Sequence, residues 1–321
     1  MARTVRAKRG EKILRAIRPN AGLEAIYRRR LYDLIEDMVT SVEHWLVAGY
    51  RKNAPNVAMD EAPPEIRAVY IGGARPWTAT INGEPLRTSR GAEIRFGSDL
   101  TAISAARRFI GELLPADELQ ALMSDLGDYW LDRFDQAAPR LASFFAKSSA
   151  KRTDAQLASI LRDGGFSVKF QMTPEVRDVV RAAIHENVSL IKSIPQQYLK
   201  NVEGAVMRSV QTGRDLSTLS KHLQKQYGVT KRRAAFIARD QNNKATAVVQ
   251  NARQRELGIT KAVWMHSHGG KTPRRTHLAN DGKVFDVAKG WYDPDVGEYI
   301  LPGQLQNCRC VMRSVIPGLA K

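Results

Sequence analysis

The sequence predicts a mainly α-helical protein with a small α+β lobe at its C-terminal end. Through most of residues 23–257, apolar side chains recur at steps of three and four, which is typical of helices that bury one face. After Gly258 the pattern changes to short alternating runs between glycines and prolines, which favours strands and loops. Prolines and glycines also interrupt residues 51–98, and this stretch predicts a loop or a small β insertion.

The length allows two domains, or one large domain with appendages. The chain has 321 residues, and three regions differ in character. We expect a basic arm and a helical region with the insertion over 1–150, further helices over 151–258, and the C-terminal lobe over 259–321.

The N-terminal half predicts an arm and three helices. Residues 1–20 form an arm with at best a short basic helix, ended by Pro19-Asn20. A long helix follows over 23–50, with Gly49 as a plausible stop. In the insertion, Asn82-Gly83 suits the turn of a hairpin. Two further helix-periodic stretches are 100–114 and 118–148.

Capping residues predict the later helices. Thr153-Asp154 suits the start of a helix over 155–165, and Thr173-Pro174-Glu175 opens another that stops at Pro195. Three more follow over 196–212, 217–227 and 231–257, the last capped by Thr230. In the C-terminal lobe, the strand-like stretches are 260–267, 283–287 and 308–312.

Composition excludes several classes of protein. Hydrophobic residues make up 43% of the chain, enough for a real core. No apolar run approaches the ~18–20 residues that cross a bilayer, and no apolar segment of a secretory signal follows the basic N-terminus. Two cysteines do not make a disulfide framework. We expect a soluble protein of a reducing cytosol, without a membrane partner.

Positive charge is concentrated in two stretches. Residues 1–30 and 221–261 each carry a net charge of +8, against +17 for the whole chain. This predicts contact with a polyanion, such as double-stranded DNA without sequence preference. Two other interpretations are a solvated helix face with a frayed tail, and a helix-turn-helix over 217–257. The candidate contacts are Lys8, Arg9, Arg232, Arg233, Arg239, Lys244 and Arg253, with the amides of Asn242, Asn243 and Asn251 between them.

The two cysteines, Cys308 and Cys310, stand one residue apart. In an extended segment, residues i and i+2 face the same side, so both sulfurs can reach one site. Three interpretations stay open: two thiols packed in a tight core, a disulfide, or ligands of Zn²⁺ with His277 and one of His266 or His268. Our first expectation is that the protein has no cofactor, and the alternative is bound zinc. The histidines near Asn280-Asp281 also allow a metal-dependent nuclease as an alternative function.

A series of motifs resembles the phage Mu F-like minor head proteins, also called phage head morphogenesis proteins. A helix with "IARDQNNKA" is followed by "VW", by "RRTHLANDGKVF" and by "LPGQLQNCRC", and the resemblance covers roughly 170–316. Asp240 departs from the family pattern, which often has Thr there, and 266–271 lack an acid and an Arg that many members carry. Residues 1–150 contain no family motif. The matching positions are Ile237, Ala238, Arg239, Asn243, Trp264, Arg274, His277, Gly282, Pro302, Asn307, Cys308, Arg309 and Cys310.

The resemblance implies a minor component of a tailed-phage head, made in the host cytoplasm and carried in the virion, inside the head or at the portal vertex. Proteins of this family act in head assembly or in DNA packaging and delivery. The implied partners are the portal protein, the major capsid or scaffold protein, and DNA. We expect no catalysis and a structural role for the motif. Asn307 would hold a turn through side-chain-to-backbone bonding, and Arg309 would face outward.

Overall fold

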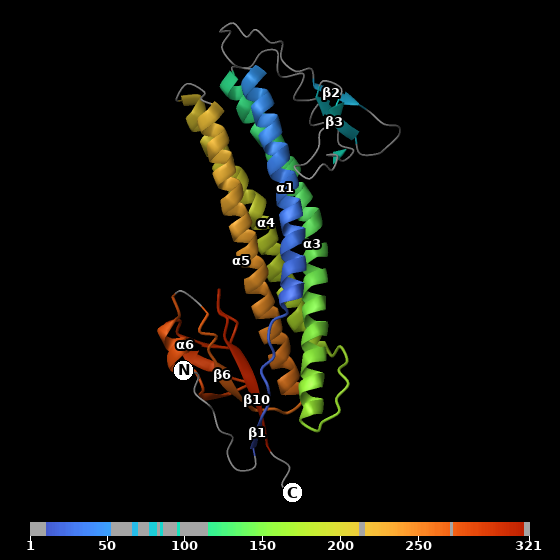
Figure 1. The fold of residues 1–321 in the computed structure, drawn as a ribbon, viewed down its shortest axis with the longest axis vertical. Coiled ribbons are helices and arrows are strands. Elements are labelled where there is room, and N and C mark those ends of the chain that lie inside the picture. Colours follow the sequence, from blue (N-terminus) through green and yellow to red (C-terminus); the bar gives the residue numbers. More distant parts are fainter. Residues whose placement is uncertain are drawn as a thin grey trace. The chain divides into compact units, whose positions relative to one another are not determined.

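A computed structural model confirms the predicted fold class: the protein is mostly helical, with four long helices and a small C-terminal antiparallel β region (Figure 1). The structure describes residues 11–52, 66–69, 77–81, 84–85, 95–96, 115–211, 216–269 and 272–317. The helices are α1 (Ala21–Lys52), α3 (Pro115–Asp163), α4 (Pro174–Gln211), α5 (Leu216–Glu256) and α6 (Arg275–Ala279). The strands are β1 (Glu11–Ile13), β2 (Ile66–Val69), β3 (Trp77–Ile81), β4 (Glu84–Pro85), β5 (Arg95–Phe96), β6 (Lys261–Met265), β7 (Val284–Asp286), β8 (Trp291–Asp293), β9 (Glu298–Ile300) and β10 (Val311–Pro317).

Two helix starts follow from capping side chains. Asn20 precedes α1, and its Oδ1 accepts a hydrogen bond of 2.8 Å from the backbone N–H of Leu23. Thr173 precedes α4, and its hydroxyl accepts a hydrogen bond of 3.4 Å from the N–H of Val176. This agrees with the predicted role of Thr173 as the N-cap. Gly49 does not end α1, which continues to Lys52.

Three predicted helix boundaries are wrong, because the helices continue through them. Thr153 lies buried inside α3, Pro195 inside α4 and Thr230 inside α5. The Thr230 hydroxyl donates to the carbonyl of Gln226, four residues earlier in the same helix. Tertiary packing of long apolar stripes outweighs the local preference of these residues for helix ends. A helix-turn-helix over 217–257 is therefore excluded.

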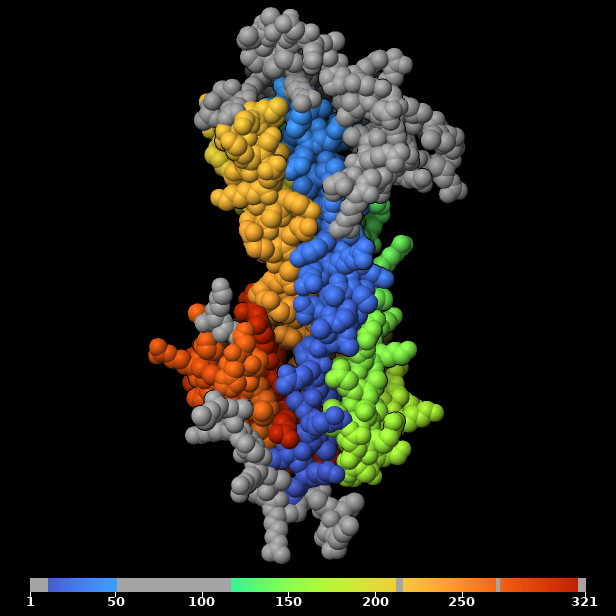
Figure 2. All heavy atoms as spheres, viewed as in Figure 1, coloured from blue at the N-terminus to red at the C-terminus, as the bar shows by residue number. Residues whose placement is uncertain are grey.

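The segment 11–20 contains a strand rather than the predicted short helix. β1 pairs antiparallel with β10, with Ile13 opposite Val315. The four-stranded sheet that contains this pair has the antiparallel order β1-β10-β6-β7. β8 and β9 form a separate hairpin. In Figure 2 the blue N-terminal segment lies against the red atoms of β10. The predicted strands at 260–267 and 283–287 are confirmed as β6 and β7, whereas the last strand begins only after Cys310.

Four short strands lie among the described residues of the insertion. β3 pairs antiparallel with β2, β4 and β5, and Ile81 lies opposite Glu84 as expected for the predicted hairpin. The predicted helix over 100–114 and the first ten residues of the arm lie outside the described residues.

The chain divides into two compact units, and each long helix contributes a part to both. The first unit comprises Met1–Arg29, Ala138–Leu190 and Ala235–Lys321, and the second comprises Arg30–Ala137 and Ile191–Ala234. Within the described residues, no helix has the length and apolar character needed to cross a membrane.

Each unit has its own buried contacts. In the first unit, small side chains allow α3, α4 and α5 to pack closely, with Ala146, Val176 and Ala252 all fully or almost fully buried. In the second unit, the Trp130 indole donates to Ser41 and the Tyr50 hydroxyl donates to the Val206 carbonyl.

Candidate functional site

One face of α5 binds the backbone of the C-terminal lobe through side-chain amides. Asn243 Nδ2 donates to the carbonyl of Cys308 at 3.0 Å, and Asn251 Nδ2 donates to that of Val287 at 2.7 Å. Gln250 reaches the Met312 carbonyl, and Gln254 donates to the Ser314 hydroxyl. Because these amides are buried and bonded inside the chain, the prediction that amides of this helix contact phosphates is wrong for Asn243 and Asn251.

Asn242, the third predicted amide, is also buried and internally bonded. Its Nδ2 donates to the backbone carbonyl of Asn20, just before α1. It therefore ties α5 to the start of another helix rather than facing solvent.

Arg253 is buried and cannot contact DNA, contrary to the prediction. Its side chain is only 1% exposed, and its Nε and Nη2 both bind the carboxylate of Asp154 at 2.8 Å. Nη1 binds Glu256 at 2.7 Å, and the guanidinium lies over the ring of Phe170. Three of the five guanidinium N–H groups bind carboxylates, and burial of the side chain keeps the other two away from a phosphate.

Lys244 and Arg239 are also engaged with neighbours in the first unit. Lys244 Nζ lies 2.6 Å from Glu186 and 3.4 Å from Asp240. Arg239 is half-buried, and its Nη2 donates to Asn307 Oδ1 at 3.4 Å. Acidic side chains distant in sequence thus neutralise part of the charge of this stretch.

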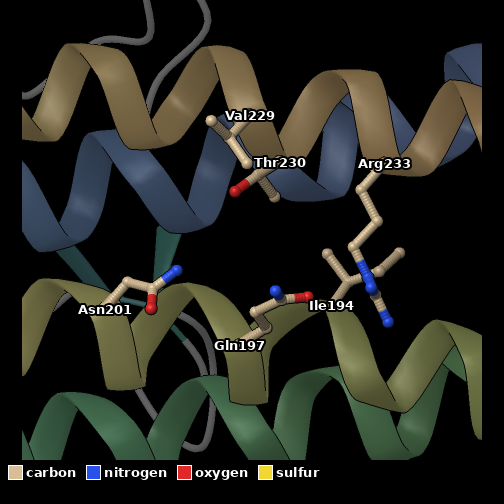
Figure 3. Close-up of a pocket in the computed structure, with 6 residues that line it drawn as sticks. All are labelled: Ile194, Gln197, Asn201, Val229, Thr230 and Arg233. Atoms are coloured by element: carbon tan, nitrogen blue, oxygen red, sulfur yellow. The ribbon is translucent and has the colours of Figure 1, made fainter.

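Arg232 and Arg233 lie in the second unit with different orientations. Arg233 extends from α5 toward α4 beside a small pocket, and its Nη2 donates to Ser193 at 2.8 Å (Figure 3). The pocket is lined by Ile194, Gln197, Asn201, Val229, Thr230 and Arg233. Arg232, in contrast, is exposed. Lys8 and Arg9 lie outside the described residues.

The loop before β10 is fixed to α5 by Asp240 and Asn307. The backbone N–H of Asn307 donates to Asp240 Oδ1, and Asn307 has a positive φ of 59°, a conformation that asparagine tolerates well. Burial raises the pKa of Asp240, and the Asn307 N–H partly offsets this effect. Asn307 thus holds its turn through its backbone and through Arg239, a different arrangement from the predicted side-chain-to-backbone bond.

Gly303 allows the same loop to approach α5 closely. It has a φ of 88°, and a Cβ added there would lie 3.2 Å from the Cβ of Ala247 and from the carbonyl oxygen of Cys310. Pro302 beside it is buried. A side chain here would be strained by the positive φ and would contact Ala247 and Cys310 more closely than is usual.

The two motif arginines of the C-terminal lobe bind backbone carbonyls. Arg274 Nη2 donates to Gln306 at 3.0 Å, and Arg309 Nη1 donates to Gly269 at 2.7 Å. Gly282 has a φ of 78°, and its N–H donates to the carbonyl of Trp264, which is fully buried. These four motif positions therefore hold loops of the lobe together.

His277, Cys308 and Cys310 form one buried cluster. His277 Nδ1 lies 3.4 Å from the sulfur of Cys308 and 3.6 Å from that of Cys310. Both cysteines are free, so the disulfide interpretation is excluded. The structure thus unites the three residues predicted as a possible metal site, and their ligand atoms all lie within 4.8 Å of one another.

Hydrogen bonds around the cluster favour a thiolate. The contact with Cys310, together with His277, lowers the pKa of Cys308 to about 4, while the same contact and burial raise the pKa of Cys310. The N–H of Gly303 donates to the Cys308 sulfur at 3.4 Å. On the other side of the imidazole, Nε2 of His277 lies 3.2 Å from Asp293, a carboxylate that is fully buried. Sequence reasoning missed Asp293, because no spacing signal links it to the motif.

The other two histidines of the lobe group with Asp281 instead. Asp281 Oδ1 accepts from the N–H of His266, and Oδ2 lies 3.1 Å from His268 Nε2. Burial, followed by the charge of His268, lowers the pKa of His266. His268 is half-exposed, so this pair lies at the surface.

The fold and this motif network define a helical protein whose last long helix carries a small antiparallel lobe. Residues 200–313 match the family described as Phage Mu protein F like protein, which confirms the resemblance for this part of the chain. This part of the chain is therefore similar to the Phage Mu protein F like proteins.

One relative is a protein of Haemophilus influenzae strain Rd described as uncharacterized. It is 34% identical over 203 residues, which cover 61% of this chain. The aligned part spans 43% of that protein, less than half its length. No solved structure matches the chain significantly.

Proposed function

We propose that this protein is a minor head protein of a tailed phage, acting in head assembly and in DNA packaging or delivery without catalysis. The internal use of the family motif is the observation that carries this proposal. Arg274 and Arg309 bind backbone carbonyls, and Asn307 binds α5. Side chains that make such internal contacts stabilise the fold, and they leave few polar groups that could act in catalysis.

We propose that fewer cationic side chains contact DNA than the sequence predicts. Arg253 is buried and Lys244 has two carboxylate neighbours, whereas Arg232 is exposed. We assign sequence-indifferent phosphate contacts to Arg232 and to Lys8 and Arg9 of the arm, with Arg233 in a supporting position. Such contacts release counterions, so the affinity should fall steeply with salt.

For contact with the portal, the major capsid protein or the scaffold, we propose the β8–β9 hairpin. Tyr292 and Tyr299 face each other across the hairpin, and they are 48% and 61% exposed. Val296 at its tip is 42% exposed. Exposed tyrosines packed on one another, with a centroid distance of 5.4 Å here, are typical anchors of protein interfaces.

The direct experiment is to purify phage particles from cells that produce this chain and to identify their proteins by mass spectrometry. The chain should be present in few copies per head. Replacing Tyr292 and Tyr299 together by serine should lower its incorporation, whereas Met172→Ser, which removes another exposed apolar side chain, should not. Particles that never contain the chain would contradict the proposal.

The alternative is a metal-dependent nuclease in the C-terminal lobe. The contact between the half-exposed His268 and Asp281 favours it, because a histidine oriented by a carboxylate can act as a general base. Incubation of the full chain with duplex DNA and Mg²⁺ or Zn²⁺ tests it. Cleavage that disappears in His268→Gln would establish the nuclease, and absence of cleavage favours the structural role.

A further inference from the structure

We propose that Nδ1 of His277 and the sulfurs of Cys308 and Cys310 bind one Zn²⁺ ion that stabilises the C-terminal lobe. The inference does not depend on the proposed role in the phage head. It rests on distances, on the contact that orients the imidazole and on the burial of the groups around it.

The distances agree with those of a tetrahedral zinc site. Zinc bonds of about 2.3 Å to sulfur and about 2.05 Å to nitrogen place the two ligand atoms about 3.6 Å apart across a tetrahedral angle. The two sulfur–nitrogen distances are 3.4 and 3.6 Å. Nδ1 of His277 therefore already lies at the distance from each sulfur that two corners of a zinc tetrahedron require.

The contact between His277 and Asp293 orients the imidazole toward the sulfurs. Nε2 faces the Asp293 carboxylate at 3.2 Å, which favours the tautomer with its proton on Nε2. Nδ1 then faces the two sulfurs with its lone pair. A carboxylate behind a histidine is also the usual arrangement around protein-bound zinc.

The buried charge around the cluster favours a bound cation. Asp293 is fully buried, and the sulfur of Cys308 accepts from the N–H of Gly303. Zinc binds cysteine as the thiolate, so any proton still on a sulfur is released to solvent on binding, and Zn²⁺ offsets the charge of the two thiolates. The two sulfurs and the imidazole are soft and borderline ligands, which favour zinc over Mg²⁺ or Ca²⁺.

The site lies where the lobe needs support. His277 belongs to the five-residue helix α6, and the cysteines come directly before β10. The lobe's cluster of buried residues is small and includes both cysteines and Trp264. A bound ion would fix α6 against β10, as structural zinc does in small domains with limited cores.

The test is the zinc content of the full chain, produced in zinc-supplemented medium and purified without chelator under reducing conditions. We expect about one zinc per chain by elemental analysis, as one buried cluster of ligands predicts. We expect none in Cys308→Ser or His277→Gln. His185→Gln, which changes an exposed histidine of α4, serves as the matched control and should keep its zinc.

A second measurement, on the wild-type chain alone, tests the site even if the variants fail to fold. Wild-type chain reconstituted with Co²⁺ should show the intense near-ultraviolet band of thiolate-to-cobalt charge transfer. Wild-type protein that contains no zinc and gives no such band would overturn the proposal, and so would zinc that persists in Cys308→Ser.

Discussion

Arg253 binds Asp154 through two parallel hydrogen bonds, from Nε to Oδ1 and from Nη2 to Oδ2, each 2.8 Å long. The two residues are 99 positions apart in the sequence and belong to α5 and α3. This bidentate ion pair converts an apparent DNA-binding cation into an internal link between two helices. The charge of a stretch therefore does not show by itself how much of that charge reaches solvent.

Removing Arg253 should destabilise the first unit strongly. Arg253→Met leaves Asp154 and Glu256 without their shared cation, and breaking a buried ion pair on one side costs about 3–5 kcal/mol. Urea unfolding followed by circular dichroism measures the loss. The matched control is Arg255→Met, since Arg255 pairs with Glu175 at the surface and should cost at most about 1 kcal/mol. Equal effects of the two variants would refute the buried role.

Asn251→Ala should also destabilise the protein. The change removes the 2.7 Å hydrogen bond to the Val287 carbonyl and leaves that acceptor unpaired, at a cost of about 1–3 kcal/mol. The same unfolding measurement applies, with Gln224→Ala at an exposed position of α5 as the control. An unchanged midpoint in Asn251→Ala would show that the amide does not hold the C-terminal lobe.

Gly228→Ala tests whether α5 is continuous. An added Cβ would meet only Arg232 Nη1, at 3.5 Å, so alanine should stabilise the helix by about 0.5–1 kcal/mol. A turn with a glycine-specific conformation at this position would give the opposite sign. Gly303→Ala is the contrasting variant, because its positive φ and close contacts with Ala247 predict a clear loss of stability.

Asp293→Asn should weaken zinc binding without removing a ligand. The amide keeps the shape of the side chain but loses the charge that orients His277, and such changes lower metal affinity by about 10–100-fold. Competition with a chromophoric chelator measures the affinity. Asp295→Asn, at an exposed position of the same loop, should leave it unchanged. Equal affinity in Asp293→Asn and wild type would contradict the assigned role.

Much of the fold could be predicted from the sequence, because long apolar stripes and a change to short alternating runs are local signals. The helix boundaries at Thr153, Pro195 and Thr230 could not. Their side chains favour helix ends, but packing along α3, α4 and α5 outweighs that preference. The pairing of β1 with β10 joins the two ends of the chain, and no local pattern reveals such a contact.

The candidate site, like the fold, could be predicted only in part from the sequence. The spacing of Cys308 and Cys310 and the motif around His277 identified the buried cluster. Asp293 was missed, since its role depends on the β8–β9 hairpin turning it toward the imidazole. The prediction for Arg253 was wrong because its acidic partner Asp154 lies in another helix, where sequence neighbours give no warning.

Hydrogen–deuterium exchange with and without random-sequence duplex DNA, at low salt, tests most directly the central claim that the family motif holds the fold while other cations contact DNA. We predict that DNA slows exchange around Arg232 and in the N-terminal arm, and that Arg232→Glu lowers the salt slope of binding by about 1. Residues 239–254 should exchange at the same rate with and without DNA. DNA-dependent protection centred on 239–254 would contradict the account.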